Sequence, residues 1–193
     1  WTGYYAGGDD EELVVDVERI LHRDDPILTG SPPSKPPCEE VYYRSPLRAG
    51  NIWNSLDDLG VPGIEGVWCD PAGGSRLWVV VSIDQEYAGH ARQVGLLTGQ
   101  IPQNAYMNRY VIVVDDDIDP TNRDDVIWAL GTRVHPPRDI HVVDRTLGSR
   151  LDPIQYDHPL PSGEGQYNAR AVIDATRAWE YRDEYPPVAE ISD

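Results

Sequence analysis

Four carboxylates cluster in Asp115-Asp116-Asp117-Ile118-Asp119, directly after the apolar residues 111–114. Active sites of α/β folds lie at the carboxyl ends of buried strands, and paired carboxylates supply the hard oxygen ligands that Mg²⁺ prefers. The cluster is therefore compatible with phosphoryl transfer by an aspartate nucleophile. That chemistry needs a downstream cation to neutralise the phosphate, but the one lysine, Lys35, lies upstream. We favour the alternative that these acids cap and charge the following helix, since negative charge stabilises a helix N-terminus.

The remaining polar residues show no motif that selects a reaction. Neither G-x-G-x-x-G, nor a P-loop, nor G-x-S-x-G occurs in the sequence. No histidine is paired with another histidine or a cysteine at metal-ligand spacing; the five are His22, His90, His135, His141 and His158. His90 lies on a predicted helix, where a packed or surface position is the default. Two cysteines, Cys38 and Cys69, are expected to be free thiols in a reducing compartment.

The elements that position these residues alternate between strands and helices, which predicts an α/β layer with part of its sheet parallel. Apolar runs predict strands at residues 13–21, 63–70, 76–83, 110–114, 139–143 and 169–173. Helices are expected over residues 45–59 and 85–97, and from a cap at Asp119 or Thr121 to about residue 134. The proline-rich residues 31–37 form a stiff connector, so we place a domain boundary near residue 40.

Composition limits the classes of function. The chain has 193 residues, 40% of them hydrophobic, which is enough for a core. Its 33 acidic and 16 basic residues give a formal net charge of −17, which disfavours nucleic acids and anionic membranes as partners. No apolar run is long enough for a membrane span. The chain opens on Trp1 without a signal-peptide pattern, and a cytoplasmic location is expected.

Several segments together resemble the UbiD family of decarboxylases that depend on prenylated flavin. The residues after Trp1, Thr2-Gly3-Tyr4-Tyr5, are similar to the stretch that follows the family's Glu-Gly-Pro motif. The other matching segments are Ile27-Leu28-Thr29-Gly30-Ser31-Pro32-Pro33, Tyr87-Ala88-Gly89-His90-Ala91-Arg92-Gln93-Val94, residues 111–120 with 125–133, and Ala171-Val172-Ile173-Asp174-Ala175-Thr176.

The resemblance implies two parts in this chain. Residues 1–40 would be the end of a flavin-binding split barrel plus the connector, and residues 41–193 a C-terminal α/β assembly domain with a mostly parallel sheet. Prenylated FMN, Mn²⁺ and K⁺ would be bound mainly by an upstream portion, present in the same polypeptide or as a separate chain. The family's catalytic Glu–Arg–Glu/Asp set would precede Trp1, so no catalytic residue or metal ligand is assigned in this sequence. A homo-oligomer is expected.

The same resemblance implies a substrate pocket that includes Met107, Asn108, Tyr110 and Leu151. Asn104 lies near the place where some members use a lysine toward the flavin phosphate, a weak cofactor contact because its side chain is neutral. The implied activity is reversible, non-oxidative decarboxylation of an aromatic, heteroaromatic or α,β-unsaturated carboxylic acid. The alternatives are a non-catalytic assembly subunit of such a complex and, less favoured, the aspartate-dependent phosphotransferase.

Overall fold

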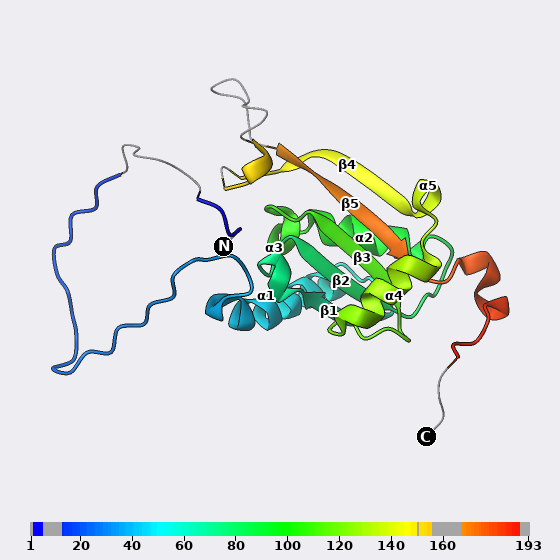
Figure 1. Cartoon of the computed structure of the whole chain (residues 1–193), viewed down its shortest axis with the longest axis horizontal. Coiled ribbons are helices and arrows are strands. Elements are labelled where there is room, and N and C mark those ends of the chain that lie inside the picture. The colour runs from blue at the N-terminus through cyan, green and yellow to red at the C-terminus, as the bar shows by residue number, and fades with distance from the viewer. Residues whose placement is uncertain (1, 6–12, 150, 156–166, 190–193) are drawn as a thin grey trace.

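The computed structural model describes residues 2–5, 13–149, 151–155 and 167–189, and its main body is one five-stranded sheet with helices on both sides (Figure 1). The strands are β1 (Ile64–Cys69), β2 (Trp78–Ile83), β3 (Tyr110–Asp115), β4 (Ile140–Leu147) and β5 (Tyr167–Ala175). The helices are α1 (Glu39–Asp58), α2 (His90–Gln100), α3 (Pro102–Ala105), α4 (Arg123–Arg133) and α5 (Pro136–Asp139). Short 3₁₀ turns lie at Pro71–Gly73, Pro153–Gln155 and Trp179–Glu184.

The strand order β1-β2-β3-β5-β4 confirms the α/β fold expected from the sequence. β2, β3 and β5 are parallel, whereas β1 and β4 join the two edges antiparallel. The parallel part is thus the buried centre of the sheet. β2 and β3 are connected through α2, as a parallel crossover requires, while a short turn over residues 70–77 connects β1 to β2.

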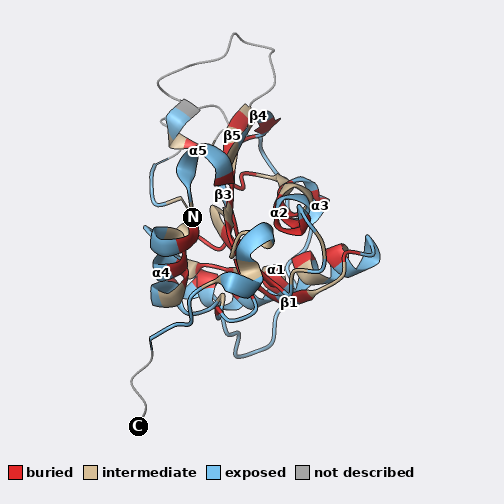
Figure 2. Cartoon of the chain, turned by 90° about the vertical axis from the view of Figure 1, so that its right-hand side faces the viewer, coloured by how far each residue is buried: buried red, intermediate tan, exposed pale blue. Residues whose placement is uncertain are grey.

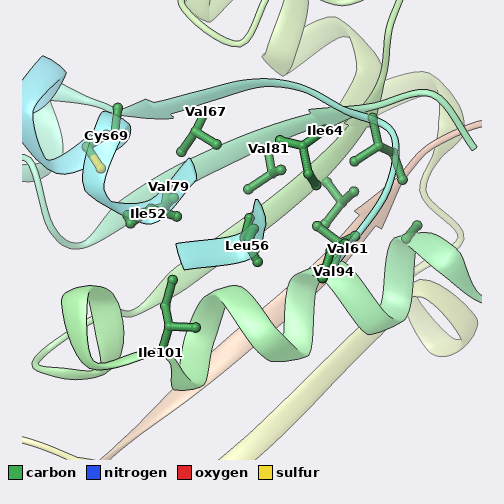
Figure 3. Packing of buried hydrophobic residues seen from close by; sticks show 14 residues of the cluster. Ile52, Leu56, Val61, Ile64, Val67, Cys69, Val79, Val81, Val94 and Ile101 are labelled. Carbon is green, nitrogen blue, oxygen red and sulfur yellow. The ribbon is translucent and has the colours of Figure 1, made fainter. Parts of the chain in front are cut away.

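The central strands are buried and lie between α4 on one side and α2 on the other (Figure 2). The sheet separates two hydrophobic clusters. Val79 and Val81 of β2 point toward α1 and α2, where they meet Ile52, Leu56 and Val94 in the larger cluster (Figure 3). Val80, between them in sequence, belongs to the second cluster beneath α4. Because successive side chains of a strand point to opposite faces, a continuous apolar run fits a strand that is covered on both sides.

Several predicted elements differ from the structure in extent or type; α2, for example, begins at His90 instead of residue 85. α1 begins at Glu39 instead of residue 45, because Val41 is buried and the two glutamates of the first turn favour a helix start there; Pro46 is accommodated inside the helix. Residues 13–21 form no strand, although their pattern is that of one. Their backbone runs apart from the sheet and pairs with no described strand (Figure 1). Their apolar side chains are exposed. An extended segment needs a neighbouring strand to form a ladder.

Candidate functional site

β3 ends at Asp115, and the aspartates at this end of the strand take part in a buried ion-pair network. The Oδ1 atom of Asp115 accepts a hydrogen bond from Gln85 Nε2 at 2.7 Å. Its Oδ2 atom accepts from Arg133 Nη1 at 3.0 Å and from the backbone N–H of Arg177 at 2.6 Å. Arg133, in the last turn of α4, also binds both carboxylate oxygens of Asp117, at 2.9 and 2.8 Å. This network joins the end of β3 to α4 and to the segment that follows β5.

The network gives these acids a structural role. Both oxygens of Asp115 are occupied by protein donors, so the carboxylate is not free to attack a phosphate. Hydrogen bonding from Arg133 lowers the pKa of Asp117, which keeps that carboxylate charged. The expected cap is wrong: α4 is capped by Asn122, whose Oδ1 accepts from the N–H of Asp124, while Asp119 accepts from Thr121 in the preceding turn. Hence the acids stabilise the domain, but by ion pairing more than by helix capping.

His90 lies in the core at the start of α2. Its Nδ1 atom accepts from the backbone N–H of Glu86 at 3.3 Å, and its ring packs on that of Tyr87 with centroids 4.4 Å apart. The side chain is fully buried. Burial lowers the pKa of His90, and the nearby Pro62 carbonyl, Glu86 and Asp84 only partly oppose this. His90 is therefore a packed core histidine that is held neutral.

Acidification should consequently weaken the fold through His90. The unfolded chain takes up a proton near pH 6.5, whereas the folded chain resists protonation, so the unfolded state binds more protons as the pH falls below about 6.5. We expect the free energy of unfolding, measured with urea, to fall between pH 7.5 and pH 5.5. The fall should be smaller in His90→Asn, which keeps an acceptor for the Glu86 N–H, and unchanged in the exposed control His22→Asn. Identical pH dependence in all three proteins would contradict the prediction.

A cavity of about 600 Å³ lies between the N-terminal residues and the α/β domain. It is lined by residues 2–5, by residues 33–35 of the proline-rich connector, and by Leu151 from the turn after β4. Most of the lining is apolar, and it includes Tyr4 and Tyr5, which are 70% and 99% exposed. Lys35 adds a positive charge. The cavity can therefore accept an apolar or aromatic body that carries an acidic group.

The other predicted pocket residues do not line this cavity. Met107, Asn108 and Asn104 are fully buried, and the Asn108 amide donates to the Arg76 and Tyr110 carbonyls at 3.2 and 3.4 Å. The Asn104 amide donates to the Thr98 carbonyl at 2.9 Å. Tyr110 is 40% exposed and lies in a different groove, with its ring 5.6 Å from that of Trp78. Only Leu151 of the predicted set lines the cavity, and the pocket roles of all the predicted residues, Leu151 included, stay predictions.

Sequence reasoning missed the groups that hold the Leu151 turn. Arg109 Nη2 donates to Asp152 Oδ2 at 2.5 Å, and the Tyr106 hydroxyl is hydrogen-bonded to Ser149 Oγ. Ser149 and Asp152 are ordinary residues of a polar loop, and each partner is 43 residues away in sequence. No local signal distinguishes such a pair before the fold is known.

The described residues do not form a metal centre. Among them, no group of three or more histidine, cysteine, aspartate or glutamate side chains is arranged to hold a metal ion. Cys38 and Cys69 are free and buried, as expected, and burial raises the pKa of the Cys69 thiol to about 12, which leaves it a poor ligand. The cavity next to Leu151 carries one cation, Lys35, and no described cluster that matches a flavin phosphate. The described residues are therefore not assigned as ligands of a metal or of a flavin.

Residues 41–175 match the family model described as the 3-octaprenyl-4-hydroxybenzoate carboxy-lyase C-terminal domain, UbiD_C. The chain belongs to this family. The match spans α1 to the end of β5 and so coincides with the sheet and its covering helices. The resemblance stated from the sequence motifs is confirmed.

Solved structures of UbiD-class enzymes share the fold. The HmfF enzyme from Pelotomaculum thermopropionicum, in complex with FMN, is 26% identical with a TM-score of 0.63, over 75% of this chain and 30% of that chain. The vanillic acid decarboxylase of Sedimentibacter hydroxybenzoicus, in its open form, is also 26% identical with a TM-score of 0.63, over 80% of this chain and 30% of that chain.

A 3,4-dihydroxybenzoic acid decarboxylase from Enterobacter cloacae is 19% identical and shares the fold with a TM-score of 0.68, over 79% of this chain and 32% of that chain. This chain thus spans about a third of the length of the structures that it resembles. Within the described residues, no helix is both long and apolar enough to cross a membrane.

Proposed function

We propose that this chain is the C-terminal part, or a subunit, of a reversible non-oxidative decarboxylase that acts on an aromatic, heteroaromatic or α,β-unsaturated carboxylic acid. Membership of the carboxy-lyase family supports the reaction class. The cavity beside Leu151 is the observation that supports the proposed substrate class. Tyr4 and Tyr5 can contact a planar ring, and Lys35 can pair with a carboxylate.

The cofactor is proposed to be prenylated FMN, with Mn²⁺ and K⁺, bound mainly by an upstream portion of the enzyme. HmfF was solved with FMN, which supports a flavin. When bound, prenylated FMN would supply the electron sink for loss of carbon dioxide. The proposed part of the described residues is to line one wall of the acid's site and to orient the acid for reaction, while the upstream portion completes the enclosure.

We also propose that residues 1–40 and 41–193 belong to different domains of the assembled enzyme. The exposed apolar side chains of residues 13–28 support this division, because such a row is costly in water unless another surface covers it. A flavin-binding barrel, in the same polypeptide or in a partner chain, is the proposed cover. Homo-oligomers are part of the same proposal.

Co-purification tests the proposed function. This chain is produced with and without the flavin-binding portion, and flavin absorbance and carbon dioxide release from a panel of aromatic and acrylic acids are recorded. We expect both signals only when the two portions are together. Assembly without turnover of any acid would favour the non-catalytic assembly subunit, and failure to assemble would overturn both functions.

Leu151 provides a sharper test of the substrate pocket. Leu151→Ala removes an only partly buried side chain from the cavity wall, so the Tm should change little while the ranking of acids by kcat/KM shifts toward bulkier ones. Ile154→Ala, in the same turn and exposed, is the matched control that should leave the ranking unchanged. If Leu151 instead anchored its turn, truncation would lower the Tm, with a cost of about 2–5 kcal/mol, and would leave selectivity unaltered.

A further inference from the structure

The turn that carries Leu151 is fixed internally by two of its own side chains. The N–H of Leu151 donates to Ser149 Oγ at 3.1 Å, and the N–H of Asp152 donates to the Ser149 carbonyl at 3.0 Å. The Oδ1 atom of Asp152 accepts from the N–H of Ile154 at 3.3 Å. Ser149 and Asp152 therefore bind the backbone N–H groups of Leu151, Asp152 and Ile154.

The same two side chains bind the turn to the connection between α3 and β3. Asp152 Oδ2 accepts from Arg109 Nη2 at 2.5 Å, and Ser149 Oγ is hydrogen-bonded to the Tyr106 hydroxyl. Between them the N–H of Met107 donates to the Leu147 carbonyl at 3.2 Å. The turn thus has side-chain links at two points and a backbone link at a third, which limits its freedom to shift.

The burial of Asp152 indicates that the ion pair with Arg109 is an integral part of the fold. Asp152 is 0% exposed although it lies in a turn at the edge of the sheet. A carboxylate buried to this degree is costly unless charged or polar groups bind it, and a charge-assisted bond to a guanidinium is among the stronger hydrogen bonds in proteins. Tyr106 is held in turn by Arg76, whose Nη1 donates to its carbonyl at 3.3 Å and whose guanidinium lies 5.1 Å above its ring.

We propose that Asp152 and Arg109, supported by Ser149 and Tyr106, are positioning residues that hold Leu151 at the cavity wall and so determine which acids the site accepts. The effect on which acids are accepted rests on the proposed function. The geometric part of the proposal, that Asp152 and Arg109 hold Leu151 in place, concerns only this chain. The hydrogen bonds and ion pair given above for Asp152 go to Arg109, Ile154 and Ser149, none of which lines the cavity. The effect of Asp152 on selectivity must therefore pass through the position of Leu151.

Amide hydrogen exchange on this chain tests the geometric part without any substrate. In Asp152→Asn the ion pair is lost, so the amides of Leu151 and Ile154 should exchange faster while those of residues 111–114 stay protected. Asp144→Asn, which changes an exposed carboxylate on β4, is the matched control and should leave exchange unchanged. Unaltered exchange at Leu151 and Ile154 in Asp152→Asn would overturn the proposal, whatever the enzyme's substrate.

Selectivity in the assembled decarboxylase tests the remainder. We expect Asp152→Asn to change the kcat/KM ratio of a bulky to a small acid by about tenfold, because small misplacements near a reacting group have large effects. Added to Leu151→Ala, it should change that ratio no further, and Arg109→Lys should restore part of the wild-type ratio relative to Arg109→Ala. A lower Tm with wild-type selectivity, or an independent additive effect, would overturn the positioning role. If Asp152→Asn alters exchange at Leu151 and Ile154 but the assembled wild-type protein converts no acid, the proposed function is refuted and the geometric proposal stands.

Discussion

Asp115→Ala should destabilise the chain by about 3–5 kcal/mol, the cost of breaking a buried ion pair from one side. Asp115 and Arg133 are both only 2–3% exposed at their side chains, so water cannot readily replace Asp115, and Arg133 keeps Asp117 as its remaining carboxylate partner. Gln85 and the Arg177 N–H lose their acceptor in the same step. Urea unfolding followed by circular dichroism would measure the loss directly.

Asp116→Ala is the matched control for this prediction. Asp116 is adjacent in sequence, but its side chain is 52% exposed and its oxygen lies 3.7 Å from Arg177. Exposed pairs of this kind contribute about 0–1 kcal/mol. Similar losses for the two substitutions would show that the buried network contributes no more than a surface pair, and would reopen a chemical role for Asp115.

Gly95→Ala should destabilise the chain by up to about 2 kcal/mol, because an overpacking penalty of about 1–3 kcal/mol is only partly offset by better helix propensity. Gly95 lies in the middle of α2, where the helix approaches β5 closely. An added Cβ would lie 2.3 Å from Val172 Cγ1 and 3.3 Å from Val113 Cγ2, so the helix or the strand would have to move. This penalty exceeds the roughly 1 kcal/mol that alanine gains over glycine inside a helix.

The same exchange in α4 should have the opposite sign. A Cβ on Gly131 meets nothing within 4 Å, so Gly131→Ala should stabilise the chain by about 0.5–1 kcal/mol. Val172→Ala, which removes the clashing methyl groups, should recover part of the loss when combined with Gly95→Ala. Thermal unfolding of the wild type, Gly95→Ala, Gly131→Ala and the double variant of Gly95→Ala with Val172→Ala gives the comparison. A stabilised Gly95→Ala variant would show that α2 does not pack this closely against β5.

The long apolar runs allowed the central strands to be predicted, because a strand buried on both faces has few alternatives in sequence. Residues 13–21 have a similar pattern but pair with no described strand. The strand predicted for them is therefore wrong, and their apolar side chains are exposed. The start of α4 was placed wrongly since Asp119 can form a turn or a cap, and the choice depends on where Arg133 must lie to reach Asp115 and Asp117.

The site was predicted less completely than the fold. Leu151 was proposed from resemblance, and the structure places it on a cavity, whereas the ion pair that holds its turn joins residues far apart in the chain. Arg133 and Asp115 are 18 residues apart and meet only after β3 and α4 have packed. Contacts of this type are consequences of tertiary structure, and a single sequence carries no direct signal for them.

The division of the core by the sheet has a consequence for how this domain tolerates change. The cluster under α1 and α2 and the cluster under α4 are made of different side chains. Substitutions that share no contacting partner usually have additive effects on stability. During evolution the two sides can therefore acquire replacements largely independently of each other. The α1 side can change in sequence while the α4 side, which contributes Arg133 to the network, stays constrained by Asp115 and Asp117.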